Sequence, residues 1–207
     1  MTALQLVQWA DVPATPWKNG GGLTRDLLLW PPSSTNSAAS SPDAWALRIS
    51  VAEVAQSGAF SAYPGVARWF CVLQGAGVVL HFNEGPHMQT TLTPDSPPLH
   101  FDGASAPRCE LLAGPTLDLN LMARHNAGRA EMSRAVAGLP WVSRAPLRAL
   151  FTLHGATLQM EGAAAVQLPA GTLAFMALSA AASAGRAWEL GSPRDSGWWL
   201  AFEPHAR

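Results

Sequence analysis

The segment Arg68-Trp69-Phe70-Cys71-Val72-Leu73-Gln74-Gly75-Ala76 is echoed without a gap by Arg148-Ala149-Leu150-Phe151-Thr152-Leu153-His154-Gly155-Ala156. The arginine, a leucine, the glycine and the last alanine coincide, and the apolar pattern between them agrees. Later, Leu92-Thr93-Pro94-Asp95 is answered in the same order by Leu168-Pro169-Ala170-Gly171. Two matches in one order indicate a duplicated β unit of about 80 residues, a period too long for a solenoid repeat.

Short strand-like runs surround both copies of the echo. Residues 45–51 alternate cleanly, with Leu47 and Ile49 on one face and Arg48 and Ser50 on the other. Further strands are expected at residues 4–9, 23–30, 68–73, 78–82, 88–93, 98–101, 108–112 and 117–122. The turn at residues 74–77 predicts a hairpin between its flanking strands. Many short strands separated by Gly and Pro turns favour barrels or jelly rolls, and their order resembles the cupin barrel.

The expected fold class is therefore all-β, with two cupin-like barrel or jelly-roll units packed together. We expect an N-terminal unit at residues 1–125, which carries the ligand pocket, and a C-terminal unit at residues 126–207. Residues 31–43 are rich in Ser and Pro and lack apolar anchors, which predicts a mobile loop inserted between two strands.

Composition argues against several function classes. The 207 residues carry a net charge of −1 and only 13% charged residues, without a basic run, which argues against nucleic-acid binding. No apolar run reaches the roughly 20 residues that span a bilayer, and no signal peptide is expected at the start. Cys71 and Cys109 lie in apolar runs and are expected to be buried thiols, which fits a cytoplasmic location.

A second informative stretch is Pro16-Trp17-Lys18-Asn19-Gly20-Gly21-Gly22-Leu23-Thr24-Arg25, which contains the only lysine of the chain. In a chain whose other basic residues are all arginine, a retained lysine favours a need for a compact ammonium group. Three successive glycines suit positive φ or close approach of the main chain. The stretch therefore predicts a binding site for a small anion. The alternative is a glycine turn between two strands, with Lys18 solvated.

Arg25, Arg48, Arg68 and Asn120 each stand in an otherwise apolar stretch. A buried guanidinium group is costly unless it is paired or meets an anion. Convergence of two or three of these groups with Lys18 would form a carboxylate pocket. The alternative is that the arginines pair with acids such as Asp26, Glu53, Asp102 or Asp118, or extend to the surface.

Blocks between residue 16 and about residue 125 together resemble one known family. They are the Pro16–Arg25 stretch, Arg48-Ile49-Ser50, Phe60-Ser61 with Pro64-Gly65, the Gly75 and Gly77 turn, Phe101-Asp102-Gly103 and Asp118-Leu119-Asn120-Leu121-Met122. This pattern is similar to that of the HutD/Ves family. The resemblance implies an RmlC-like bicupin without metal. It also implies a role in bacterial histidine utilisation through sensing of an intermediate such as urocanate or formylglutamate, although some members are described only as stress-induced.

We expect the ligand to be a small carboxylate held without any cofactor. The expected ligand-binding residues are Lys18, Asn19, Gly20, Gly21, Thr24, Arg25, Arg48, Ser50, Arg68 and Asn120. No metal is expected, because none of the six histidines forms the His-x-His pair of metal-binding cupins. No pattern indicates a nucleophile for covalent catalysis, and no catalytic residue is assigned.

Three functions stay open at this point. The first is a non-catalytic binding protein that modulates a catabolic pathway. The second is a cofactor-free isomerase or hydrolase acting on a small acid, with Asp118 or His100 as acid or base. The third is a β interaction module without a ligand, for which the nine scattered tryptophans leave room for a homodimer face.

Overall fold

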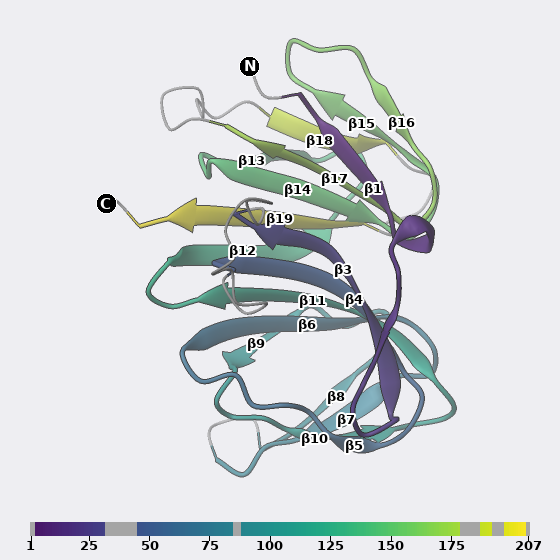
Figure 1. Cartoon of the computed structure of the whole chain (residues 1–207). Helices are drawn as coiled ribbons and strands as arrows, with labels where there is room; N and C mark the ends of the chain where they lie inside the picture. Colours follow the sequence, from purple (N-terminus) through teal and green to yellow (C-terminus); the bar gives the residue numbers. More distant parts are fainter. Residues whose placement is uncertain (1–2, 32–44, 85–87, 179–186, 192–196, 206–207) are drawn as a thin grey trace. The chain divides into compact units, whose positions relative to one another are not determined.

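A computed structural model describes residues 3–31, 45–84, 88–178, 187–191 and 197–205. The loop expected at 31–43 lies outside these residues except for its first residue. The described chain is all-β apart from a single 3₁₀ turn at Trp9–Asp11. It divides into two compact units, Pro13–Ala127 and a second unit made of Met1–Val12 and Gly128–Arg207 (Figure 1).

The first unit contains two antiparallel sheets. The six-stranded sheet has the order β2 (Thr15–Pro16), β3 (Gly22–Trp30), β4 (Leu47–Val54), β11 (Thr116–Arg124), β6 (Val66–Gln74) and β9 (Leu99–Asp102). The four-stranded sheet has the order β5 (Gly58–Ala59), β10 (Arg108–Leu111), β7 (Val78–His81) and β8 (Gln89–Leu92).

The second unit also contains two antiparallel sheets. The first has the order β1 (Gln5–Gln8), β17 (Thr172–Ala177), β14 (Leu147–Thr152), β19 (Gly197–Pro204) and β12 (Gly128–Ala135). The other has the order β13 (Pro140–Val142), β18 (Ala187–Gly191), β15 (Ala156–Met160) and β16 (Val166–Leu168).

The strand order of β4 to β11 recurs in β12 to β19. β4-β11-β6-β9 corresponds to β12-β19-β14-β17, and β5-β10-β7-β8 corresponds to β13-β18-β15-β16. The echo between residues 68–76 and 148–156 falls on the equivalent strands β6 and β14. The duplication predicted from the sequence is therefore present in the topology.

Two expectations about this organisation need correction. The expected division at residue 125 placed the first twelve residues in the N-terminal unit, but β1 pairs with β17 of the second unit, Gln5 opposite Phe175. The expected hairpin at residues 74–77 is not a hairpin, because β6 and β7 belong to different sheets. Gly75 and Gly77 do have positive φ, so the turn chemistry is right, but a tight turn alone does not specify which strands pair.

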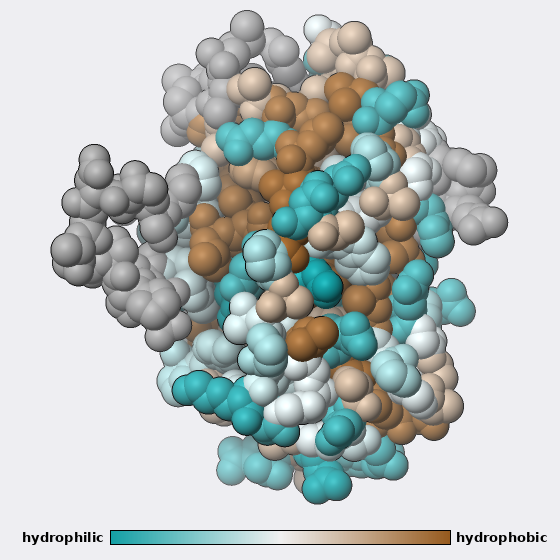
Figure 2. All heavy atoms as spheres, turned by 45° about the vertical axis from the view of Figure 1, so that its right-hand side comes forward, coloured by the Kyte–Doolittle hydropathy of each residue, from teal (hydrophilic) through white to brown (hydrophobic). Residues whose placement is uncertain are grey.

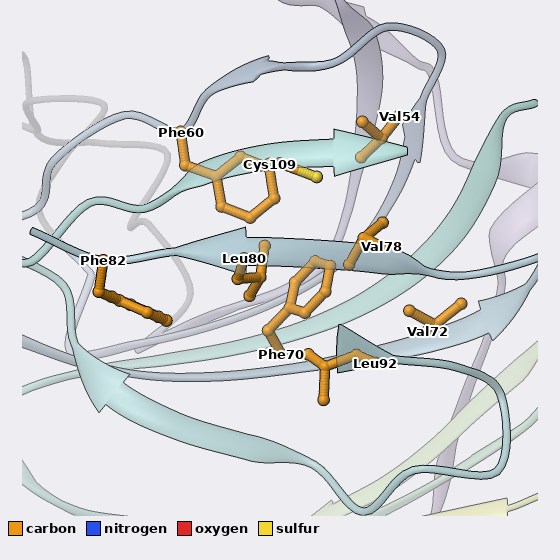
Figure 3. Close-up of a cluster of buried hydrophobic side chains, with 9 residues drawn as sticks. All are labelled: Val54, Phe60, Phe70, Val72, Val78, Leu80, Phe82, Leu92 and Cys109. Atoms are coloured by element: carbon orange, nitrogen blue, oxygen red, sulfur yellow. The ribbon is translucent and has the colours of Figure 1, made fainter. Parts of the chain in front are cut away.

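The interior of the first unit contains an apolar cluster. Its buried side chains come from strands of both sheets and from the loops after β5 and β7; they are Val54, Phe60, Phe70, Val72, Val78, Leu80, Phe82, Leu92 and Cys109 (Figure 3). Both cysteines are buried, as predicted. Alternation in β4 is confirmed, with Leu47 and Ile49 fully buried on one face and Arg48 and Ser50 on the other.

The surface in Figure 2 mixes hydrophilic and hydrophobic residues on the face shown. Large exposed hydrophobic side chains among the described residues are Leu6, Met88, Leu112, Val136, Leu139 and Val142. Within the described ranges, no helix has the length and apolar character needed to cross a membrane.

Candidate functional site

The first unit contains a cavity of about 610 Å³. Its walls come from β2, β3, β4, β5, β6 and β11 and from the loop after β5. The lining residues are Thr15, Pro16, Trp17, Lys18, Asn19, Thr24, Asp26, Arg48, Ser50, Ala52, Ala59, Phe60, Ser61, Ala62, Tyr63, Arg68, Asn120 and Met122.

Most of the residues expected to bind a ligand line this one cavity. They are Lys18, Asn19, Thr24, Arg48, Ser50, Arg68 and Asn120. Gly20, Gly21 and Arg25 do not line it, so the cavity does not bring these three residues together with the others. The structure thus brings together residues that are up to about one hundred positions apart in the sequence.

Strand geometry explains why Arg25 lies elsewhere. Successive side chains of a strand point to opposite faces. Because Thr24 and Asp26 face the cavity, the half-buried Arg25 between them faces the other side of β3. The same alternation places Asp26 in the cavity wall, whereas the sequence suggests Asp26 only as a structural partner for an arginine.

The glycines next to Lys18 serve the backbone of the turn. Gly20 has a φ of 70°, which favours glycine, and its amide donates to the Trp17 carbonyl oxygen at 3.0 Å. The Gly21 amide donates to Asn19 Oδ1 at 3.0 Å. A Cβ at Gly22 would collide with the carbonyl oxygen of Glu53. The amides of Gly20 and Gly21 are therefore used within the loop, and of this stretch Trp17, Lys18 and Asn19 reach the cavity.

Arg68 is the most deeply placed cation of the cavity. Only 8% of the residue is exposed, and its Nε and Nη2 donate to Asn120 Oδ1 at 3.1 and 2.7 Å. Its guanidinium carbon lies 4.7 Å from the centre of the Phe60 ring. Burial lowers the pKa of Arg68 to about 10, so the group is still charged at neutral pH.

Arg48 is less buried than Arg68 and has an acidic partner. Its Nε donates to Asp26 Oδ1 at 2.7 Å, and the two side chains are 18% and 36% exposed. Burial is the largest single influence on the pKa of Arg48 and lowers it, but the hydrogen bond and charge of Asp26 together with Tyr63 outweigh burial, and the pKa is raised overall. Of the two alternatives left open by the sequence, pairing with an acid holds for Arg48, whereas Arg68 is held by a neutral amide.

Aromatic side chains form the remaining wall, and the sequence analysis had not assigned them to the site. Trp17 is fixed by a hydrogen bond from its Nε1 to Thr24 Oγ1 at 2.7 Å and meets Phe60 edge to face at 6.3 Å. Tyr63 interacts electrostatically with both Arg48 and Arg68. Their signal was present, since Phe60 and Tyr63 stand in the Phe-Ser…Pro-Gly block of the family pattern.

The acid and base considered for catalysis do not line the cavity. His100 is exposed and stacks on Trp69 at 4.2 Å. Asp118 is completely buried, and its Oδ2 accepts a hydrogen bond from Thr116 Oγ1 at 2.9 Å. Burial raises the pKa of Asp118 to about 8, against the bond from Thr116 and the charge of Arg68, which both lower it.

Among the described residues, no three His, Cys, Asp or Glu side chains are grouped closely enough to hold a metal ion. The expectation of a metal-free protein stays a prediction. Elemental analysis of untagged protein tests it, and a stoichiometric transition metal would contradict it.

The second unit has an equivalent position filled by aromatic rings. Arg148 on β14 corresponds to Arg68 on β6. Asn120 lies opposite Phe70, two residues after Arg68, and Trp199 on β19 lies opposite Leu150, two residues after Arg148. Trp199 therefore corresponds to Asn120. The Trp199 ring stacks on Trp141 at 5.0 Å and 3°. Trp188 packs edge to face against both tryptophans, at 6.2 and 6.4 Å. Indole rings therefore occupy the place that in the first unit is open and polar.

Comparison with known proteins identifies relatives over much of the chain. The HutD family model matches residues 9–188. An uncharacterized 21.2 kDa protein in the hutC 3′ region of Pseudomonas putida is 35% identical over 132 residues, which cover 64% of each protein. Protein Ves of Citrobacter koseri is 32% identical over 122 residues, 58% of each protein. The matched segment thus spans less than two thirds of the length of these curated relatives.

Solved structures extend the likeness to nearly the whole chain. A conserved protein of unknown function from Pseudomonas aeruginosa PAO1 has a TM-score of 0.81 at 25% identity, covering 99% of this chain and 100% of that one. HutD from Pseudomonas fluorescens SBW25 has a TM-score of 0.79 at 24% identity with the same coverage.

More distant structures share the fold alone. Ylba of E. coli has a TM-score of 0.63 at 8% identity, and the match covers 100% of this chain and 92% of that one. Oxalate decarboxylase of Bacillus subtilis has a TM-score of 0.60 at 7% identity, and the match covers 100% of this chain and 79% of that one. These likenesses and the two duplicated β units establish a bicupin fold. Since the family model matches most of its length, the chain belongs to the HutD family.

Proposed function

We propose that this protein binds a small carboxylate in the cavity of its first unit and, without catalysing a reaction, modulates bacterial histidine utilisation in response to that ligand. The observation that carries the proposal is the state of Arg68. It is a buried cation at the wall of a cavity, and its hydrogen bonds go to a neutral oxygen of Asn120.

A buried charge without a counter-charge is costly, and the cost falls when an anion arrives. In the described part of the chain, the ion pairs are Arg48–Asp26 and His81–Glu110, and neither includes Arg68. Two bonds to one Asn120 oxygen fix the plane of the guanidinium group and leave Nη1 available for a carboxylate.

The rest of the cavity indicates what accompanies the carboxylate. Lys18, exposed at the rim, adds a mobile positive charge. Trp17 and Phe60 offer flat apolar surface, while Ser50, Ser61 and Tyr63 offer hydroxyl groups. This combination suits a small acid that also has a planar or amide-like polar part. Urocanate and formylglutamate both have that character, and the names of the family and of the P. putida relative point to the hut region.

The test is a thermal-shift screen of the purified chain at pH 7 against urocanate, formylglutamate, formate and, as an uncharged control, imidazole. A bound acid at one hundred times its Kd stabilises the folded state by about 2.7 kcal/mol, enough to raise Tm by several degrees. Arg68→Met should abolish the shift, whereas Arg129→Met, an exposed arginine on β12 of the second unit, should retain it.

Incubation of each binding acid with the protein, followed by NMR for several days, separates binding from catalysis. An unchanged ligand supports a non-catalytic role. Turnover abolished by Arg68→Met would instead support the cofactor-free enzyme, and an absence of any shift with all acids would overturn the proposal.

A further inference from the structure

Asp118 is a buried acid that does not line the cavity of the first unit. It lies on the same face of β11 as Asn120, two residues earlier, and is completely buried. Thr116 supplies one hydrogen bond to its Oδ2, while its Oδ1 has no hydrogen-bond partner. A carboxylate normally accepts several hydrogen bonds, so this environment is poorly suited to a negative charge.

The groups around Asp118 set its charge. The neighbouring strands place Ala52 of β4 and Val72 of β6 opposite it. The charged or titratable groups that interact with it among the described residues are Arg68 on β6 and Cys109 on β10. Burial raises the pKa of the Cys109 thiol to about 12, so Cys109 stays neutral and Arg68 is the cation that faces Asp118.

Asn120 prevents the obvious ion pair. The guanidinium group of Arg68 is turned to Asn120 Oδ1 by two hydrogen bonds, and no ion pair between Arg68 and Asp118 is present. If Asp118 were ionised, its carboxylate and the ligand carboxylate would both depend on the single positive charge of Arg68, and they would repel each other in a poorly solvated interior.

We propose that Asp118 acts on the pocket through Arg68: kept protonated, it leaves the charge of Arg68 to an incoming anion, so that the site binds an anion only together with a proton on Asp118. The inference rests on the proposed function, since it concerns the same cavity. Ionisation of Asp118 cancels much of the attraction and adds repulsion of the ligand.

The linkage has a definite sign. Burial raises the pKa of Asp118 to about 8 in the free protein, and a bound anion raises it further because like charges disfavour ionisation. The affinity for an anion should therefore be constant below pH 7 and decline above pH 8. If only the protonated form binds, affinity falls about tenfold between pH 7 and pH 9.

The experiment is isothermal titration calorimetry with formate and with formylglutamate, whose carboxyl groups stay ionised, from pH 6.5 to 9.5. Each pH is measured in two buffers of different ionisation enthalpy, which counts the protons taken up on binding. Wild-type protein should take up close to one proton per anion at pH 9 and almost none at pH 7.

Three variants make the test specific. Asp118→Asn should bind with an affinity that varies less than about twofold over this range and with almost no proton uptake up to pH 9. Thr116→Val removes the hydrogen bond that favours the ionised Asp118 carboxylate, so the decline of anion affinity should begin at a higher pH than in wild type. Asp95→Asn, which removes an exposed carboxylate elsewhere, should behave like wild type.

The outcomes separate the two proposals. Binding whose pH dependence and proton uptake survive Asp118→Asn would overturn the role of Asp118 and leave the carboxylate site intact. Absence of binding by both probes at every pH would overturn the carboxylate site and the role of Asp118 with it.

Discussion

Arg68 and Asn120 form a two-pronged contact in which Nε and Nη2 of the arginine donate to a single amide oxygen at 3.1 and 2.7 Å. The same edge of a guanidinium group, Nε and one Nη, often binds the two oxygens of a carboxylate through parallel bonds, but here both donors converge on one oxygen. Here the partner is neutral, so the contact orients the guanidinium group without cancelling its charge.

Asn120→Asp tests that distinction with an almost isosteric change. The new carboxylate should form a buried ion pair with Arg68, and the free energy of unfolding at pH 7 should stay within about 1 kcal/mol of the wild-type value. Affinity for formylglutamate should fall at least tenfold, about 1.4 kcal/mol, because the cation is already neutralised. Chemical denaturation and calorimetry measure the two effects, and an unchanged affinity would show that Arg68 does not bind the anion.

Lys18→Met removes a charge at the rim and keeps the apolar stem. Because Lys18 is exposed, stability without ligand should change by no more than about 0.5 kcal/mol. Affinity should fall by about 1.5–3 kcal/mol, the scale of a lost hydrogen bond to a charged group. Lys18→Arg should also bind poorly, because a planar fork does not replace a compact ammonium. A Lys18→Met protein that unfolds easily yet binds normally would make Lys18 a structural residue.

Asp118→Asn should change the pH dependence of stability. The pKa of Asp118 is about 8 in the folded protein and 3.8 for an ordinary aspartate, so between these values the folded state holds a proton that the unfolded chain has lost. Wild-type stability therefore falls as pH rises from about 4 to 8 on account of this group. The asparagine of the Asp118→Asn variant does not titrate, so the variant does not lose stability in this way. At pH 8 its free energy of unfolding should exceed that of wild type by on the order of 2 kcal/mol.

Urea denaturation at pH 5, 6, 7 and 8 measures the difference, with Asp95→Asn as the control. A gap between Asp118→Asn and wild type that does not widen with pH would show that Asp118 is already ionised in the folded protein.

Trp199→Asn introduces into the second unit the residue type found at the equivalent place of the first. Loss of the stacked ring leaves a cavity next to Trp141 and Trp188, and stability should fall by about 3–5 kcal/mol. Affinity in the first unit should be unchanged. Guanidinium denaturation together with calorimetry checks both, and wild-type stability would show that the tryptophan cluster is not a packed core.

Periodicity and repetition in the sequence were sufficient for the fold class. Short apolar runs between Gly and Pro turns indicated an all-β chain, and the echo around Arg68 and Arg148 indicated two related units. The strand pattern is local and the echo is a similarity between two segments of one sequence, so both can be recognised without knowing which residues are in contact. The pairing of β6 and β7 was misjudged because a turn sets chain reversal, whereas side-chain burial decides which sheet each strand joins.

The sequence by itself predicted that Lys18 would converge with two or three of Arg25, Arg48, Arg68 and Asn120, and all of these except Arg25 line the same cavity. Only the tertiary structure decided their roles. Two-residue alternation on β3 directs Asp26, not Arg25, to the cavity, and proximity across strands pairs Arg48 with Asp26 while Asn120 takes Arg68. These outcomes depend on distances between strands far apart in sequence, and the charge state of Asp118 depends on burial, neither of which a residue pattern encodes.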